Sequence, residues 1–357
     1  MKRQREIFDL STIREILVRG PNWVGDNIFA IPAVQRLKRE FPAGRLTVLA
    51  AKGLVPIWEL VEGVDGVIPF DLRGGFRDLK GKRGLVRQLR RRRFDLAVVF
   101  PRSFESALWV WLAGIPHRWG YGEQGRSCLL TRPVHSKRDY RLTPRIDYYY
   151  RLLDNGAGEA GAPPARLVIS PDLQQQASEI LRLAGVDLSG RTLVGFHPRA
   201  SYGPAKCWPS DYFARLARLL TERKDASVLL FGSEQEKELL EGIAVRAGKR
   251  AINLAGRTDL KTLAALIALC RVFVANDSGP LHLAAALKVP VIGLYGSTDP
   301  SATGPRGETA RVIYKGVECS PCLKRVCPKD FSCMETIEPE EVMATVEELW
   351  HLSASQQ

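Results

Sequence analysis

The sequence lacks a long hydrophobic run. No stretch of roughly 18 consecutive apolar residues occurs, the length that indicates a membrane-spanning helix. The basic residues near the start of the chain are not followed by an apolar segment long enough for the core of a secretion signal. We therefore expect neither a spanning segment nor a signal peptide, and a cytoplasmic protein.

Two common nucleotide-binding motifs are also missing. No GxGxxG sequence follows the first expected strand, and no P-loop sequence GxxxxGK[ST] occurs in the chain. These absences argue against a dehydrogenase and against an NTPase. No paired carboxylates at metal-binding spacing accompany the loop motifs described below, so we expect catalysis that requires no divalent cation.

Composition and charge are those of a globular protein with acidic partners. The apolar fraction of 45% and the charged fraction of 25% are ordinary for such proteins. A length of 357 residues favours two domains over a single core. The net charge of +13 favours nucleic acid, an anionic membrane surface or a phosphorylated substrate.

Strand-like apolar runs alternate with helical segments along the whole chain. A segment rich in glycine, proline and alanine at 155–165 separates two such series and is typical of a linker. The alternation predicts an α/β fold with two Rossmann-like, doubly wound domains and a ligand cleft between them. We expect the domains at 1–160 and 161–335, followed by a C-terminal helix and tail at 336–357. The expected strands are 16–19, 46–50, 67–70, 96–100, 193–196, 228–231, 251–254, 272–275 and 291–295.

The segment 274–287 is the most informative in the chain. It is typical of a buried strand, a polar turn and the first turns of a helix, which Ser278 or Gly279 can cap. The free N–H groups and partial positive charge of such a helix start favour a phosphate. Asp277 and His282 flank it with groups able to hold a sugar or a diphosphate, although the Asp-Ser-Gly sequence alone equally fits a tight turn.

Two further loops carry candidate catalytic groups. Asp26, after the first strand and at the start of a helix expected from about residue 27, is a candidate general base; its alternative role is a helix N-cap. Lys206 lies after the first strand of the second series and suits a phosphate, and Ser201 can add a hydrogen bond. A lone loop lysine is otherwise simply solvated.

A fourth loop, 231–234, follows another strand of the second series. Glu234 can accept hydrogen bonds from ribose hydroxyls, as acidic residues after such strands do in nucleotide-binding folds. The alternative is a first-turn glutamate that the helix dipole favours.

Together these segments resemble the ADP-heptose:lipopolysaccharide heptosyltransferases, glycosyltransferase family 9, and among them most closely the type II members. The matching pieces occur in the family's order from residue 16 to about 300. They are GPNWVGD at 20–26, SFESAL at 103–108, AGIPHR at 113–118, YGPAK at 202–206 with WP at 208–209, LFGS at 230–233, NLAG at 253–256 and the stretch 276–287.

The resemblance implies a GT-B fold, with the acceptor bound to the first domain and the nucleotide sugar to the second. It implies an inverting, metal-independent transfer of L-glycero-D-manno-heptose from ADP-heptose to an inner-core heptose of lipopolysaccharide. The alternatives are a related GT-B transferase of type I or III, with another acceptor or donor, and a non-enzymatic protein that binds nucleic acid or metal. We expect a monomer, peripheral on the cytoplasmic face of the inner membrane.

The resemblance also implies roles for single residues. Asp26 matches the base that deprotonates the acceptor hydroxyl, and Lys206 matches a lysine that neutralises the leaving diphosphate. Two positions depart from the family: Cys207 stands where an arginine is usual, and Arg199 where a glycine is usual. The residues expected at the donor are Ser201, Glu234 on the ribose, Asp277 on the sugar, and Ser278, Gly279 and His282 at the diphosphate.

Four cysteines form a cluster near the end of the second domain. Cys319, Cys322, Cys327 and Cys333 have the spacing CxxC-x4-C-x5-C. In a reducing compartment this favours a structural zinc or an iron–sulfur site, while a disulfide pair or no bond at all stay open.

The segment 82–93 carries seven basic residues with leucine and valine along one face. It predicts a basic amphipathic helix at an anionic bilayer, or else a solvated helix whose apolar stripe packs inward. Because no aromatic residues interleave with the basic ones, we do not expect nucleic acid as a partner. Arg102 and Arg118, in the family-like segments, are expected to face the acidic acceptor.

Overall fold

The computed structural model describes residues 12–71, 79–136, 140, 142–154, 156, 161–188 and 192–354. They belong to two compact units. Unit 1 comprises 1–22, 30–138 and 148–162, and unit 2 comprises 23–29, 139–147 and 163–357. The predicted linker falls partly outside the described residues and the predicted domain boundary at residue 160 wholly so, and both stay predictions.

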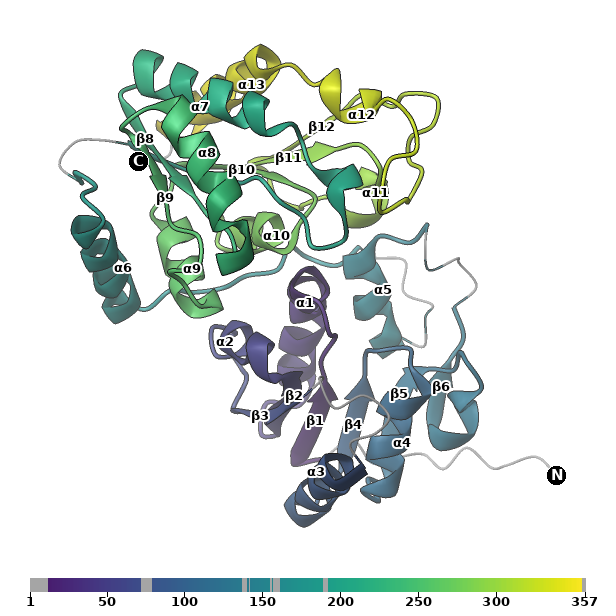
Figure 1. The fold of residues 1–357 in the computed structure, drawn as a ribbon. Helices are drawn as coiled ribbons and strands as arrows, with labels where there is room; N and C mark the ends of the chain where they lie inside the picture. The colour runs from purple at the N-terminus through teal and green to yellow at the C-terminus, as the bar shows by residue number, and fades with distance from the viewer. Residues whose placement is uncertain are drawn as a thin grey trace. The chain divides into compact units, whose positions relative to one another are not determined.

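Unit 1 contains a six-stranded parallel sheet in the order β3-β2-β1-β4-β5-β6 (Figure 1). The strands are β1 (Glu15–Arg19), β2 (Arg45–Ala51), β3 (Gly66–Phe70), β4 (Leu96–Val99), β5 (His117–Tyr121) and β6 (Arg132–Val134). The helices of this half of the chain are α1 (Val24–Glu40), α2 (Val55–Trp58), α3 (Leu79–Arg92), α4 (Phe104–Leu112) and α5 (Arg145–Arg151).

Unit 2 contains a second six-stranded parallel sheet, in the order β12-β11-β10-β7-β8-β9. Its strands are β7 (Thr192–His197), β8 (Ala226–Leu230), β9 (Ala251–Asn253), β10 (Val272–Asn276), β11 (Val291–Tyr295) and β12 (Ala310–Tyr314). Its helices are α6 (Pro171–Leu183), α7 (Ser210–Arg223), α8 (Lys237–Ala247), α9 (Leu260–Ala268), α10 (Gly279–Ala286), α11 (Pro300–Thr303), α12 (Ser332–Glu335) and α13 (Pro339–Ala354).

Counted from its own first strand, each sheet has the order 3-2-1-4-5-6 of a dinucleotide-binding Rossmann domain. The predicted class, two doubly wound α/β domains, is therefore confirmed. The central strands β4, β8, β10 and β11 are buried along their whole length, which explains their nearly continuous apolar sequences.

Helices cover both faces of the second sheet. Helices α7, α8 and α13 lie on one face, and α9 and α10 on the other (Figure 1). Leu349 of α13 is fully buried in the core formed with α7 and α8. The C-terminal helix is therefore part of this core rather than an appendage to it.

Ligands of doubly wound sheets bind where the strand order reverses, at the carboxyl ends of the strands. In unit 2 that point lies between β7 and β10, which pair in parallel. The loops that follow β7, β10 and β11 therefore meet at one edge of the sheet. Among the described residues, no helix combines the length and the apolar character needed to cross a membrane.

Candidate donor site

The segment 274–287 folds as its sequence predicts. β10 ends at Asn276, Ser278 is the N-cap of α10 with an extended backbone (φ −148°), and Gly279 is the first helical residue. The Ser278 hydroxyl is not used on its own helix, since its Oγ lies 3.2 Å from Nδ1 of His197 at the end of β7. The start of α10 thus lies at the carboxyl edge of the sheet, as a phosphate site requires.

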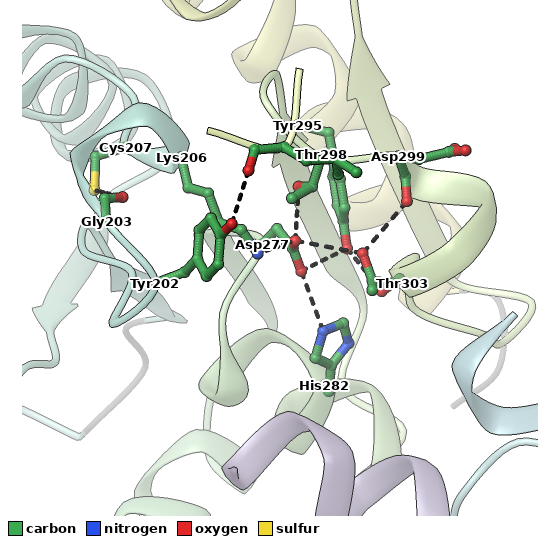
Figure 2. A network of polar contacts seen from close by, with 11 residues as sticks. Tyr202, Gly203, Lys206, Cys207, Asp277, His282, Tyr295, Thr298, Asp299 and Thr303 are labelled. Carbon is green, nitrogen blue, oxygen red and sulfur yellow. Dashed lines mark hydrogen bonds and ion pairs between the residues drawn. The ribbon is translucent and has the colours of Figure 1, made fainter. Parts of the chain in front are cut away.

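Asp277 is the centre of the site (Figure 2). Its side chain is 4% exposed, and both carboxylate oxygens are engaged. A carboxylate accepts about four hydrogen bonds, so the five side chains around Asp277 leave no position for a further donor. On Oδ2 the distances are 2.5 Å from Lys206 Nζ, 2.7 Å from Thr298 Oγ1 and 3.3 Å from Thr303 Oγ1; on Oδ1 they are 3.3 Å from Tyr295 Oη and 3.5 Å from His282 Nε2.

This environment keeps Asp277 ionised. Burial alone would raise the pKa of the carboxyl group, but the hydrogen bond from His282 and the charge of Lys206 outweigh it. The pKa of Asp277 therefore lies well below its usual range. The same negative charge, together with burial, raises the pKa of Tyr295 well above its ordinary value, so that hydroxyl remains a donor.

His282 has one nitrogen to spare. Its Nε2 faces Asp277, while Nδ1 is buried with no hydrogen-bond partner among the described residues. In the neutral ring with Nε2 donating, Nδ1 carries a lone pair that can accept a hydrogen bond from a hydroxyl. A buried polar atom without a partner is unusual and points to a ligand group at this position.

The lysine loop is supported from the cysteine-rich segment. Lys206 ends a short 3-10 turn, and its Nζ lies 5.1 Å from the centre of the Tyr202 ring. The Tyr202 hydroxyl donates to the carbonyl of Leu323 (2.7 Å), and the amide of Ala205 donates to the carbonyl of Arg325 (3.1 Å). These main-chain carbonyls fix the loop and with it the direction of the lysine.

Asn276 fixes the same loop from the inside. Its buried side chain accepts a hydrogen bond from the amide of Trp208 (2.9 Å) and donates to the carbonyl of Pro198 (2.8 Å). The last residue of β10 therefore fastens both ends of the loop that carries Lys206. Ser201 is exposed within this loop.

Glu234 and the NLAG segment come together. Glu234 is the first residue of a short 3-10 turn after β8; its side chain is 64% exposed and lies 3.4 Å from Lys237 Nζ. Gly256 has φ +71°, and a Cβ at this position would collide with the Glu234 carboxylate. Glu234 has the first-turn position of a glutamate that the helix dipole favours. It also has the exposure that contact with a ribose requires. Both roles remain open, so the ribose role stays a prediction.

Asp26 lies in the first turn of α1, because the helix begins at Val24, about three residues earlier than predicted. It is therefore not the N-cap. Its side chain is 22% exposed, with Oδ1 3.9 Å from Nε of Arg145. Asp26 thus pairs with an arginine of α5, and its carboxylate form is the form that a general base needs.

The first turn of α1 belongs by its contacts to unit 2. The ring of Phe29 lies 4.5 Å from that of His282, centre to centre. A Cβ added to Gly279 would lie 2.6 Å from Cβ of Val24, so only glycine permits this approach of α10 to the turn. The turn that carries Asp26 therefore packs directly on the donor motif.

Several residues of the site escaped the sequence argument: Tyr295, Thr298, Thr303 and His197. The first three follow β11 or lie at its end, and they reach Asp277 because β11 pairs with β10. The available signal was the polar run 296–299 after a predicted strand. The sequence does not state which strand is next to which.

The two departures from the family pattern are side chains with other roles here. Cys207 is buried, and burial raises the pKa of its thiol, so it carries no charge toward a ligand. Arg199 Nε lies 3.9 Å from Glu236 Oε1. The extra arginine thus has an acidic partner of its own.

Arg102 and Arg118, both in unit 1, make contacts within that unit. Arg102 forms an ion pair with Glu123. Arg118 donates from Nε to the carbonyl of Leu129 (2.7 Å) and from Nη1 to that of Ile115, and burial lowers its pKa. Their contact with an acceptor stays a prediction.

The four clustered cysteines line one cavity of about 40 Å³, with Ala205 and Ser297 in its wall. All seven cysteines of the chain are free thiols. Burial, and then the three neighbouring thiols, raise the pKa of Cys333 to about 11. Among the described residues, no three His, Cys, Asp or Glu side chains are arranged to hold a metal ion. The metal therefore stays a prediction.

Solved structures share this fold. The structure of E. coli ADP-heptose lipopolysaccharide heptosyltransferase II superposes with a TM-score of 0.79 at 29% identity, covering 95% of this chain and 99% of that one. A family 9 glycosyltransferase from Veillonella parvula gives a TM-score of 0.84 at 21% identity, covering 96% and 98%. With two Rossmann sheets and the fold of these solved relatives, the protein is a glycosyltransferase of the GT-B class.

Sequence comparison narrows the class. The model of glycosyltransferase family 9 (heptosyltransferase) matches residues 82–331. Lipopolysaccharide heptosyltransferase 2 of Salmonella typhimurium is 36% identical over 307 residues, 84% of this chain and 87% of the relative. Lipooligosaccharide heptosyltransferase 2 of Haemophilus ducreyi is 36% identical over 312 residues, 84% and 88%. The chain belongs to glycosyltransferase family 9, the heptosyltransferases, and the predicted family is confirmed.

Proposed function

We propose that the protein transfers L-glycero-D-manno-heptose from ADP-heptose to an inner-core heptose of lipopolysaccharide, with inversion at the anomeric carbon. The names of the heptosyltransferase 2 relatives support heptose transfer to lipopolysaccharide, and the name of the E. coli ADP-heptose lipopolysaccharide heptosyltransferase II supports the donor. The observation that carries the proposal is the buried Lys206–Asp277 pair beside the N-terminus of α10.

On the donor side, the residues stabilise a leaving diphosphate. The amides of Ser278 and Gly279 and the dipole of α10 attract the anion. Lys206 neutralises charge that develops on the diphosphate as the glycosidic bond breaks. Glu234 accepts hydrogen bonds from the ribose hydroxyls, and Ser201 adds a further hydrogen bond to the donor.

The role of Asp277 is then mainly to orient Lys206 and His282. Because five side chains already contact its oxygens, a sugar hydroxyl must displace one of them to reach the carboxylate. The free Nδ1 of His282 offers that hydroxyl a second acceptor.

On the acceptor side, Asp26 is the base. It removes the proton from the acceptor hydroxyl as that oxygen attacks the anomeric carbon from the face opposite ADP, through an oxocarbenium-like transition state. No step requires a divalent cation. We place the protein, as a monomer, on the cytoplasmic face of the inner membrane, where its lipid-linked acceptor lies.

The test is ADP release and product mass with ADP-heptose and a truncated core lipid. Asp26→Asn removes the base and keeps the shape of the side chain, so we expect kcat to fall by about 10²–10⁴-fold. Donor binding, measured by calorimetry with ADP, should be retained. Glu62→Gln, a carboxylate outside the site motifs, is the control and should leave turnover unchanged.

Turnover unaffected by Asp26→Asn would contradict the assignment of the base. A mass increase with another nucleotide sugar in place of ADP-heptose would contradict the donor. Transfer to a core lipid that lacks heptose, and none to one that carries it, would favour a type I transferase instead.

A further inference from the structure

Helix α4 of unit 1 is apolar on its outer side as well as its inner side. Ala107 and Val110 are fully buried, as expected of the face toward the sheet. The outer residues recur at i, i+4, i+7 and i+8, the spacing of one helical face. They are Phe104 (45% exposed), Leu108 (partly buried), Trp111 (47% exposed) and Leu112 (39% exposed). We call these four residues the α4 stripe.

Helix α3 lies beside helix α4 (Figure 1). Lys82, near its start, pairs with Glu105 of α4 (2.5 Å), and Arg90, near its end, donates to the carbonyl of Leu112 (2.6 Å). The two helices therefore run side by side in the same direction. Since Glu105 is the one acidic residue in the sequence of α4, the pair with Lys82 offsets the negative charge there.

The exposed side of α3 is strongly cationic. Leu85 and Leu89 are buried, so the apolar positions of this amphipathic helix pack inward. The sequence of α3 contains no acidic residue. The remaining basic side chains are exposed at Lys80, Arg83, Arg87, Arg90, Arg91 and Arg92, and Arg93 follows them.

We infer that the α4 stripe and the α3 arginines form one docking surface for an anionic lipid bilayer. Tryptophan and phenylalanine favour the headgroup level of a membrane, where an apolar stripe can insert. Arginines beside it bind the phosphates of anionic lipids. This inference rests on the proposed function, because that function has a lipid-linked acceptor. It adds which surface of the protein contacts the membrane.

The combination selects a bilayer over other acidic partners. Nucleic acid offers phosphates but no apolar layer for Trp111 and Leu112. A second copy of this chain would bury the stripe but would bring two sets of α3 arginines together. A bilayer alone satisfies both parts, and membrane binding of this kind usually needs two such signals.

The experiment is co-flotation of the full chain with phosphatidylcholine vesicles, with and without phosphatidylglycerol. We expect binding only to the anionic vesicles, and weaker binding as salt is raised. Phe104→Ser/Trp111→Ser should reduce the bound fraction at least tenfold at low salt, and so should Arg87→Gln/Arg91→Gln. The matched control is Leu183→Ser/Val245→Ser, two residues of unit 2 that are each 73% exposed. It should bind like the unchanged protein.

Each remaining outcome decides against the surface. Unchanged flotation of the Phe104/Trp111 variant, or equal binding to neutral vesicles, would overturn it. If light scattering shows a dimer that this variant converts to a monomer, the stripe is an interface between copies. Turnover with a deacylated, water-soluble acceptor separates the two proposals: its failure contradicts the proposed function, whereas the vesicle result tests only the surface.

Discussion

Asp277 is contacted by five side chains, and Lys206 is the cation among them that makes the shortest contact. Its partner Lys206 is only 12% exposed, so the ion pair is screened little by water. In the protein without donor, the carboxylate of Asp277 orients the ammonium group of Lys206. The diphosphate of the donor would replace Asp277 as the partner of that ammonium group. The ion pair therefore holds Lys206 in position before the donor binds.

Lys206→Met removes the ammonium group and keeps the length of the side chain. We expect kcat to fall by about 10²–10³-fold, because the positive charge that would neutralise the leaving diphosphate is lost. The free energy of unfolding should fall by about 3–5 kcal/mol, since Asp277 is left buried without its cation. ADP release and chemical denaturation measure the two effects.

Lys224→Met is the matched control, because Lys224 forms a surface pair with Glu347 (3.3 Å). Its expected cost is below about 1 kcal/mol, with turnover unchanged. Equal effects of the two substitutions would show that the buried pair has no special role.

His197 gives the fold a pH dependence. Burial lowers its pKa, and the charge of Glu236 only partly opposes this. The unfolded chain, with a histidine pKa of about 6.5, then binds a proton that the folded protein does not. Stability should be full above pH about 6.5 and decline as the pH falls toward the lower folded-state pKa.

Thermal unfolding between pH 8 and pH 5 measures this decline. His197→Gln cannot take up the proton in the unfolded state, so its unfolding temperature should depend less on pH in that window. An identical slope in the variant would mean that another group is responsible.

At the scale of elements, the cysteine-rich segment carries an open prediction. Four thiols line one cavity next to Ala205, one residue from Lys206. For a structural zinc we expect about one metal atom per chain by elemental analysis of purified protein, and for an iron–sulfur cluster about two or four iron atoms. Loss of that metal should lower the unfolding temperature and the turnover together.

Cys322→Ser should reduce the metal content, whereas Cys128→Ser, at an exposed cysteine outside the cluster, should not. Metal-free protein in which all four clustered thiols react with an alkylating reagent would contradict the prediction. A mass lower by two hydrogens per bond would instead indicate disulfides.

Helix α13 packs against α7 and completes the hydrophobic core of unit 2. Leu349 is fully buried, whereas Leu352 on the same helix is 42% exposed. We expect Leu349→Ala to cost about 2–5 kcal/mol of unfolding free energy through loss of burial and an unfilled cavity. Leu352→Ala should change it by less than about 0.5 kcal/mol. Chemical denaturation of both variants checks the contrast, and similar costs would mean that α13 does not complete the core.

For the whole molecule, the sequence was most informative where strands are buried on both faces. The runs at 272–276 and 291–295 are fully buried, and their apolar sequences predicted them. β6 has three residues, and β12 is only partly buried; both lie at sheet edges, where the pattern is weak. β5 was missed because its first residues, His117 and Arg118, are polar.

Only part of the candidate donor site could be predicted from the sequence, because local motifs do not show which strands are neighbours. Asp277 and Lys206 belong to sequence motifs that can be recognised locally. Thr298 and Tyr295 reach Asp277 only because β11 is the neighbour of β10, a fact of sheet order that no local pattern contains. Lateral strand order is thus what separates the known motifs from the complete site.

The lysine loop is held by the carbonyls of Leu323 and Arg325, which are main-chain groups. Every amino acid supplies a carbonyl, so mutational drift at these two positions leaves both bonds available. An insertion or deletion in the segment would instead shift the carbonyls along the chain and release the loop. The cysteine-rich segment should therefore tolerate substitutions at these two positions better than insertions or deletions.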